Sequence, residues 1–343
     1  MRRALCLAIA LIALVAAPAG ATTTVIADHL ARPRGLAIAP DGTLYATLVG
    51  TGGKRCNFEG CFGASGSIVK VTREGAVKTV ADGLLSMRGR PDGFFSLGAD
   101  QLTVLPDGRL MTAISAEFNE APNTPPRQVP KAVRKQSGRL VFVTPGGRRE
   151  IGPNVSAVEY RDDPDGEGKV SNPYGVAALG DALYVSDSAA NTLLEIRGSD
   201  VRTIAVFPHT EAGAQSVPAA LTAGTDGALY VGEYTGNESK SHSARIWRVA
   251  PGAAPVVFAS GLTTISALAS GPDGAVYATE FRPGRVVRIA PDGTKTIVAT
   301  GLHYPGGVAV GKDGKVYVSD WSVAGATRED AYRKHTGRIL LLT

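Results

Sequence analysis

One pattern recurs six times along this chain and constrains its fold more than any other feature. Each copy is an apolar run, a tight turn that usually carries Asp-Gly, and a second apolar run that usually carries Leu-Tyr or Val-Tyr. The copies begin at Gly35, Gln101, Gly175, Ala220, Ala267 and Gly307. Asp-Gly between two such runs is a strong signal of a β-hairpin. The sequence therefore predicts one hairpin repeated six times.

A second hairpin follows each of the first five copies. These hairpins begin at Ser67, Arg139, Thr192, Arg245 and Arg285. One repeat is therefore four strands, A to D, and four-stranded repeats of this kind are typical of the blades of a β-propeller. We predict an all-β fold, a six-bladed β-propeller of four-stranded blades.

The sixth copy has strands A and B and a third strand, "GRILLLT", but no fourth strand after it. The segment Thr22–Leu30, "TTTVIADHL", resembles the D-strand ends "KTVADGL" and "KTIVATGL". We expect this N-terminal strand to complete the last blade, which closes the ring and leaves no open edge between the first and last blades.

The N-terminus has the pattern of a secretory signal peptide. Arg2 and Arg3 precede an apolar run from Ala4 to Ala16, and small residues follow up to Ala21. We predict a signal peptide over residues 1–21 and the propeller over residues 22–343. The alternative is an uncleaved anchor, although the run is short for a membrane span. We expect an exported protein, periplasmic or secreted, without a membrane span after cleavage.

Cleavage changes how the charge and the cysteines are interpreted. Two arginines are lost, so the formal net charge falls from +5 to +3 and gives no reason to expect a nucleic-acid partner. We expect a monomer. Two cysteines remain, Cys56 and Cys61, and an even pair in an exported chain suggests a disulfide. Free thiols and a metal site are the alternatives.

Insertions fall in one set of turns. The A–B and C–D turns are short throughout, whereas the B–C and D–A connections vary widely, with long segments at residues 48–66, 115–136, 155–172 and 322–336. In an up-and-down blade these two sets lie on opposite faces of the ring. Long loops on a rigid scaffold usually carry function, so we expect the loop-rich face to be the functional one.

A carboxylate recurs at the end of strand B in four copies: Asp187, Glu233, Glu280 and Asp320. These groups could form a partial ring that binds a cation or supplies acid–base chemistry. Alternatively, each accepts hydrogen bonds from the turn that follows its strand. We favour the second interpretation, because strand B lies roughly 5 Å further from the channel than strand A.

Residues that lead into strand A lie closer to the channel and are stronger candidates for ligand binding. They are Arg34, Asn172, Tyr174, His303 and Tyr304, with His29 next to the first link. The surrounding Pro and Gly residues shape the turn, and a lone histidine is more often structural. Tyr174 and the acidic loop before it differ most from the other copies.

That acidic loop, "YRDDPDGEGKVSN", contains four carboxylates: Asp162, Asp163, Asp165 and Glu167. Hard oxygen donors in a glycine-rich loop can bind a divalent cation such as calcium. The loop lacks the length and spacing of an EF-hand, and a solvated acidic turn is the alternative.

The chain resembles the ScyD/ScyE family of exported bacterial propellers, which are related to NHL-repeat proteins. The residues that carry the resemblance are "RPRGLAIAPDGTLY", the segment from the acidic loop through "SNPYGVAALGDALYVSDS", and "YPGGVAVGKDGKVYVSD". The resemblance covers essentially the whole mature chain. It implies the propeller fold and export, and it implies no defined activity.

Two more distant propeller families, gluconolactonase-type and strictosidine-synthase-like proteins, keep an enzyme among the alternatives. The first typically has Pro-Asn-Gly leading into strand A, with the Asn on a metal. Here the triplet is Pro173-Tyr174-Gly175, so that ligand is missing, although Asp187 matches an aspartate at a B-strand end.

Three hypotheses therefore remain. The first is binding of a small molecule or protein partner on the loop-rich face, and the second is a metal-dependent hydrolase at the same place. The third is an inert structural or interaction module. We lean away from an enzyme.

Overall fold

The structure is a computed structural model that describes residues 22–57, 60–72, 74–89, 95–115, 125–211, 213–235, 242–322 and 336–343. The segment interpreted as a signal peptide, residues 1–21, lies outside this described part, as do residues 116–124 and 323–335 of the two largest insertions. In the described ranges, no helix is both long and apolar enough to span a bilayer.

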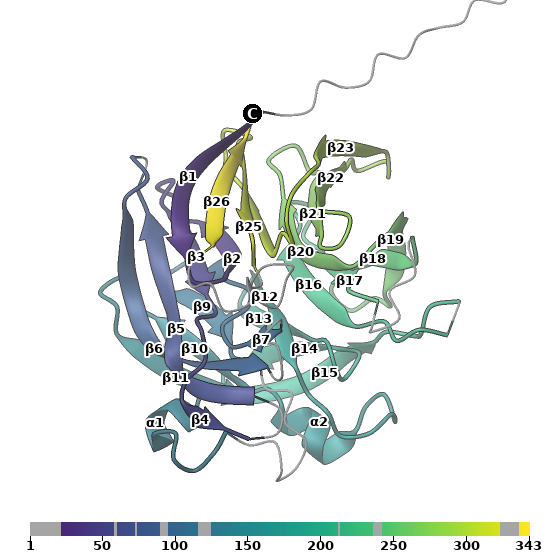
Figure 1. Ribbon diagram of the computed structural model, residues 1–343. Helices are drawn as coiled ribbons and strands as arrows, with labels where there is room; N and C mark the ends of the chain where they lie inside the picture. Colours follow the sequence, from purple (N-terminus) through teal and green to yellow (C-terminus); the bar gives the residue numbers. More distant parts are fainter. Residues whose placement is uncertain are drawn as a thin grey trace, which may run out of the picture.

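Six antiparallel sheets, each built on four main strands, are arranged around a central axis as a six-bladed β-propeller (Figure 1). The predicted fold is confirmed. Blade 1 has β2 (Pro33–Ile38), β3 (Leu44–Leu48), β5 (Gly60–Val71) and β6 (Val77–Gly89). Blade 2 has β8 (Thr103–Val104), β9 (Leu110–Ala113), β10 (Arg139–Val143) and β11 (Arg149–Asn154). Blade 3 has β12 (Pro173–Leu179), β13 (Ala182–Asp187), β14 (Thr192–Arg197) and β15 (Asp200–Val206).

The second half of the ring repeats this order. Blade 4 has β16 (Pro218–Ala223), β17 (Leu229–Glu233), β18 (Ala244–Val249) and β19 (Val256–Leu262). Blade 5 has β20 (Ile265–Ser270), β21 (Val276–Glu280), β22 (Arg285–Ile289) and β23 (Lys295–Ala299). Blade 6 has β24 (Gly307–Val310), β25 (Val316–Asp320), β26 (Gly337–Leu342) and β1 (Thr23–Leu30).

The N-terminal strand closes the ring, as the sequence predicts. β1 pairs antiparallel with β26, with Thr23 opposite Leu342 and Leu30 opposite Gly337. Beyond the strands, the backbone N–H of Thr22 donates to the carbonyl of Thr343, and the N–H of Thr343 donates back to Thr22. Blade 6 is thus built from both ends of the described chain (Figure 1).

The Asp-Gly turns form because each residue fits its position. In the first turn Oδ1 of Asp41 accepts the N–H of Thr43 at 2.8 Å, while Gly42 has φ 86°, which favours glycine. The same aspartate bond, to the N–H two residues on, recurs at Asp107, Asp226, Asp273, Asp292 and Asp313. Local side-chain chemistry therefore specifies the hairpins.

The hydrophobic core is divided into six clusters, one between each pair of neighbouring blades. Near the axis the blades approach so closely that three of them, blades 1, 3 and 6, require glycine near the start of strand A. A Cβ on Gly175 would lie 2.6 Å from the carbonyl oxygen of Ala219 in the next blade, and one on Gly307 would lie 1.9 Å from that of Arg34. The glycine two residues after Pro33, Pro173 and Pro305 therefore reflects packing between blades.

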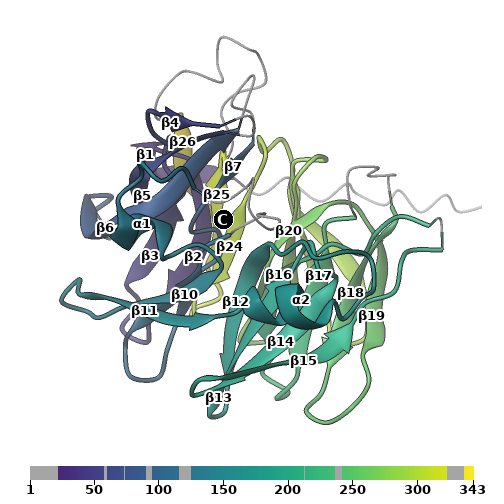
Figure 2. The ribbon, with the colours of Figure 1, turned by 90° about the horizontal axis from the view of Figure 1, so that it is seen from below.

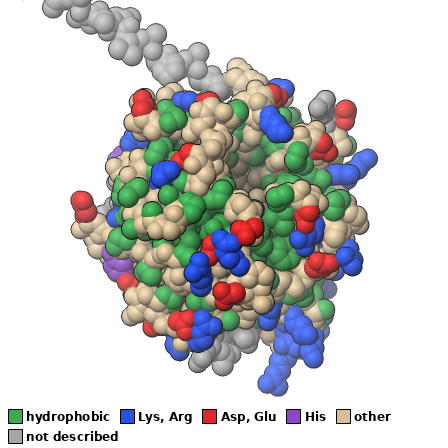
Figure 3. Space-filling view, turned by 180° about the vertical axis from the view of Figure 1, so that it is seen from behind, with side chains coloured by type: hydrophobic (Ala, Val, Ile, Leu, Met, Phe, Trp, Pro, Cys, Tyr) green, Lys and Arg blue, Asp and Glu red, His purple; other side chains and the backbone are tan. Residues whose placement is uncertain are grey.

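The insertions gather on one face of the ring. In Figure 2 the short strands β4 (Arg55–Cys56) and β7 (Ser96–Leu97) lie at the top of the view, and short A–B and C–D turns lie at the bottom. The helices α1 (Lys131–Arg134) and α2 (Ala157–Asp162) belong to a B–C and a D–A insertion. The short-turn face has a central hollow with hydrophobic side chains around it (Figure 3).

This hollow, of about 240 Å³, is lined by all six A strands, through residues such as Leu36, Val176 and Leu268. Inside the ring the amide of Gln101 reaches across the axis from blade 2, and its Nε2 donates to the carbonyls of Ser266 and Gly306 at 3.1 and 3.0 Å. The hollow is therefore surrounded by hydrophobic side chains but exposes mainly polar surface to solvent, and a buried amide occupies the channel inside it.

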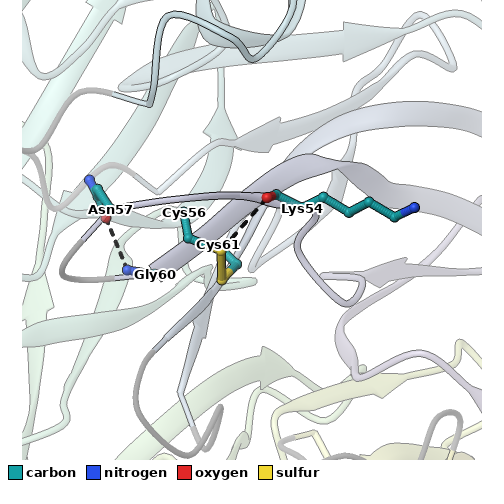
Figure 4. Close-up of a disulfide and its surroundings, with 5 residues drawn as sticks. All are labelled: Lys54, Cys56, Asn57, Gly60 and Cys61. Carbon is teal, nitrogen blue, oxygen red and sulfur yellow. Dashed lines mark hydrogen bonds between the residues drawn. A yellow bond between two sulfur atoms is a disulfide. The ribbon is translucent and has the colours of Figure 1, made fainter.

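Cys56 and Cys61 form a disulfide, with their Cα atoms 4.0 Å apart. The bond joins β4 to the start of β5 (Figure 4), and the turn between them is held by a 3.0 Å hydrogen bond from the Gly60 N–H to Oδ1 of Asn57. The predicted disulfide is confirmed. Such bonds persist in oxidising compartments, which is consistent with an extracellular or periplasmic location.

Candidate functional site

On the loop-rich face, each blade contributes one large or charged side chain near the start of strand A or the end of strand B. Together we call them the mouth ring: Arg34, Asp100, Tyr174, Tyr234, Phe281 and Tyr304. Arg34 and Tyr174 lie in the first residues of β2 and β12. At both positions a bulge breaks the regular register of the strand with its neighbour.

Arg34 of blade 1 and Asp100 of blade 2 form a buried ion pair within the ring. Nη1 of Arg34 bonds Oδ1 of Asp100, and Nη2 donates to the carbonyl of Ser96 at 2.9 Å. Burial alone would lower the pKa of Arg34, but the Asp100 carboxylate raises it above its usual range. Burial raises the pKa of Asp100, and the Arg34 charge opposes that shift. A buried ion pair of this kind is weak evidence for stability, because desolvation of the two charges opposes their attraction.

Aromatic rings complete the mouth ring. The guanidinium of Arg34 lies 6.0 Å from the centre of the Tyr174 ring. Tyr234 and Phe281 have ring centres 5.6 Å apart, and Phe281 and Tyr304 have theirs 5.2 Å apart. Burial raises the pKa of Tyr234 to about 12 and that of Tyr174 beyond its usual range, so both phenols stay neutral at physiological pH.

Two further arginines, Arg32 and Arg88, lie near the ring. Arg32 is only 7% exposed and lies beside Arg34 and Arg88. Burial, followed by the charges of Arg34 and Arg88, lowers the pKa of Arg32 to about 10. Among these arginines, Arg34 is the one whose carboxylate partner, Asp100, is described. Three arginines therefore lie close together at this part of the mouth ring.

The other candidates from strand A starts are placed differently. His303 stacks on Trp321, with ring centres 4.4 Å apart and planes 8° apart, and its Nδ1 lies 3.8 Å from Asp320. Asn172 donates its backbone N–H to Asp187, and its side-chain oxygen is buried with no hydrogen-bond partner among the residues that the structure describes. The side chain of His29 is 85% exposed on the outermost strand of blade 6. Thus His29 is not part of the mouth ring.

The four B-strand carboxylates are not brought together. Each is at most 1% exposed and is bonded mainly within its own blade. Glu280 accepts the N–H of Thr263, and Asp320 accepts the N–H of His303. In three blades the partner is an arginine at the start of strand C: Arg245, Arg285 and Arg338. These carboxylates fasten the links that lead into and out of each blade.

Asp187 differs from the other three because no arginine faces it. Its partner across the strand pair is Thr192. Instead, its carboxylate accepts hydrogen bonds from the hydroxyl of Ser171 and from the N–H groups of Asn172, Ala189 and Ala190. Burial raises the pKa of Asp187, and these donors oppose the shift.

The acidic loop forms a cluster that only partly matches the sequence prediction. Carboxylate oxygens of Glu159, Asp163 and Asp165 all lie within 4.8 Å of one another. Asp162 instead bonds Arg161 at 2.6 Å and points to solvent, and Glu167 bonds His209 and Gln215. Of the four predicted ligands, two are in the cluster and two are not. Within the described ranges, this is the one such group of three potential metal ligands.

Sequence reasoning overlooked four of the residues that matter here: Asp100, Tyr234, Phe281 and Glu159. A signal existed for three of them. Asp100 occupies the position before the second hairpin copy, as Arg34 does before the first, and Tyr234 and Phe281 directly follow the carboxylates Glu233 and Glu280. Glu159 lies in α2, and no repeat copy offers a counterpart to that helix.

No family model matches the sequence, and a search of curated proteins found no match. The ScyD/ScyE resemblance is therefore not confirmed. Solved structures with a similar fold include a streptogramin B lyase, at 13% identity and TM-score 0.52, which covers 94% of this chain and 98% of its own. A virginiamycin B lyase from Staphylococcus aureus with quinupristin is 15% identical, with TM-score 0.53, and the match covers 91% of this chain and 94% of its own.

A gluconolactonase from Xanthomonas campestris is 12% identical with TM-score 0.59, covering 94% of this chain and 90% of its own. These neighbours are six-bladed β-propellers, and at this identity the likeness shows the fold alone.

Proposed function

We propose that this protein is an exported, monomeric propeller that binds a small aromatic carboxylate at the mouth ring on its loop-rich face. The observation that carries the proposal is the buried Arg34–Asp100 pair, surrounded by aromatic side chains and by further arginines. Arg32 and Arg88 lie close to this pair, and arginine side chains bind planar carboxylates through paired donors.

The chemistry of the ring matches this class of ligand. A ring-shaped apolar group can pack on Tyr174, Tyr304 or Phe281, while its carboxylate faces the arginines, which bind planar anions through paired donors. The neighbours include a lyase with quinupristin and a gluconolactonase, so propellers of this fold accommodate small molecules. The disulfide supports export, and the predicted signal peptide would direct it.

Catalysis by a metal at the mouth has less support. The described B-strand carboxylates are each bonded to a backbone N–H, and three of them to an arginine. They leave no shared centre at which a metal ion could activate water.

Calorimetric titration with a panel of aromatic carboxylic acids and their uncharged amides tests the proposal. We expect at least one acid to bind at millimolar concentration or below, and its amide to bind about tenfold more weakly or worse, because the arginines favour the anion. Tyr174→Ala should weaken the acid about tenfold through lost aromatic contact. Lys312→Ala, on the short-turn face, is the matched control and should bind as the parent does.

Two results would overturn the proposal. One is the absence of binding by every acid of the panel. The other is binding of acid and amide with equal affinity, unaffected by Tyr174→Ala.

A further inference from the structure

The acidic loop between blades 2 and 3 carries a second site, away from the mouth ring. Glu159 comes from α2, Asp163 ends that helix, and Asp165 lies in the turn that follows. Their carboxylate oxygens lie within 4.8 Å of one another. One calcium ion holds its oxygen ligands at about 2.3–2.6 Å, so oxygens up to about 5 Å apart can touch the same ion.

Glu159 supplies an independent observation. Its side chain is only 2% exposed, and neither carboxylate oxygen has a hydrogen-bond partner of good geometry within the described residues, although the backbone N–H of Val170 lies near the carboxylate. Buried carboxylates elsewhere in this protein are bonded to arginines or to backbone N–H groups. An ionised buried carboxylate beside two further carboxylates is unfavourable, and either a bound cation or a proton relieves it. Burial, followed by the charge of Asp165, raises the pKa of Glu159 to about 8.

The neighbouring groups do not neutralise the cluster. Asp165 accepts the side-chain amide of Asn191 at 2.9 Å and the N–H of Glu167 at 3.0 Å, and both donors are uncharged. Asp163 accepts the N–H of Gly168 at 3.2 Å. Arg161, the basic residue of the helix, is bonded to Asp162 instead. Three carboxylates thus converge with no bonded cation among their described partners.

We infer that Glu159, Asp163 and Asp165 form a binding site for a hard divalent cation, of which calcium is the best match. All three donors are oxygens, and the cluster holds no histidine or cysteine of the kind that zinc prefers. The glycine-rich turn has Gly166 and Gly168 at φ 72° and 107°, a flexible backbone that suits the variable geometry of calcium better than the strict octahedron of magnesium.

The site would fix the loop that leads to the mouth ring. The hydroxyl oxygens of Ser156, just before α2, and Ser171 lie 2.7 Å apart, and Ser171 also bonds Asp187. Two residues later the chain enters β12 and reaches Tyr174. A cation at the cluster therefore holds both ends of the acidic loop against blade 3.

Calorimetric titration of the purified, chelator-treated protein with calcium chloride tests this inference, alongside thermal unfolding with calcium or with EDTA. We expect one calcium ion per chain and a rise in Tm of about 4 °C at a concentration roughly 100 times the dissociation constant. Magnesium should bind at least about tenfold more weakly.

Two variants separate loss of the site from loss of the fold. Glu159→Gln keeps the shape of the side chain, and Asp163→Asn suits the left-handed backbone at φ 46°, where Asn is well tolerated. Both should remove the calcium-dependent rise in Tm. In EDTA both should unfold at the parent temperature or above, because each relieves repulsion between like charges. Asp162→Asn, next to the cluster but bonded to Arg161, should keep the full response.

The inference fails if the protein shows no calcium binding at millimolar concentration. It also fails if Glu159→Gln and Asp163→Asn respond to calcium as the parent does. Tyr174→Ala should keep its calcium response, so the outcome here is distinguishable from that of the mouth-ring experiment.

Discussion

At the scale of single residues, the buried carboxylates at the ends of strands B show how one repeated position takes different partners. Glu233 receives a guanidinium, a backbone N–H and the indole N–H of Trp247 at 2.8 Å. Glu280 receives only Arg285 and the N–H of Thr263 among its described contacts. Removing the arginine should therefore lower the free energy of unfolding more in blade 5 than in blade 4.

We expect Arg285→Met to lower the free energy of unfolding by about 3–5 kcal/mol, because it leaves Glu280 buried with one backbone donor. Arg245→Met should lose less, since Glu233 keeps Trp247 and a backbone N–H. Urea unfolding of both variants measures the difference. Adding Glu280→Gln to Arg285→Met should recover part of the loss, and an equal loss in both blades would contradict this account.

At the scale of secondary-structure elements, the hairpin of β4 and β5 is held by a disulfide in a part of the protein that has little hydrophobic core. β4 has two exposed residues and pairs with β5 alone in the described sheet. Cys61 is buried, whereas Cys56 is exposed. A two-residue strand supplies few hydrogen bonds, so the covalent bond has to hold this part of the insertion.

Replacing both cysteines, Cys56→Ser with Cys61→Ser, should lower the free energy of unfolding by about 2 kcal/mol, the value the chain-entropy model gives for so short a loop. The propeller should remain folded, since the pair lies outside the six blade-to-blade clusters. Urea unfolding with circular dichroism measures both quantities. Loss of the β-sheet spectrum would show that the disulfide stabilises the propeller and not only its own hairpin.

At the scale of the whole molecule, closure of the ring depends on contacts between residues far apart in the sequence. β1 pairs with β26, and the hydroxyl of Ser319 in blade 6 donates to the carbonyl of Arg34 in blade 1 at 2.7 Å. The cluster between blades 6 and 1 contains Ala27 and Leu30 of β1 together with Leu36 and Ile339. The first strand therefore contributes both an edge and part of a core.

Deletion of residues 22–30 should expose the edge of β26 and open this cluster, so we expect aggregation or loss of cooperative unfolding. Size-exclusion chromatography and thermal unfolding report the outcome. A circular permutant that joins Thr343 to Thr22 and begins at Asp181, in a short exposed turn, keeps the pairing and should stay folded and monomeric. A soluble, stable deletion variant would contradict the role of β1 in closure.

The sequence by itself determined the six blades, their closure by the N-terminal strand, and the disulfide. These features depend on residues that are close together in the chain, such as Asp41 and Gly42 in a hairpin turn, or on strand patterns that repeat. Turn chemistry and alternating apolar runs act over a few residues, so they can be read without coordinates.

Only the tertiary structure decided which side chains converge. Arg34 meets Asp100 because neighbouring blades approach within contact distance at the axis, and Glu159 joins Asp163 and Asp165 because a short helix and a left-handed residue turn the loop back on itself. Asp162 and Glu167, adjacent in sequence to that cluster, turn toward Arg161 and His209. Convergence depends on irregular backbone and on contacts between blades, which no local pattern encodes.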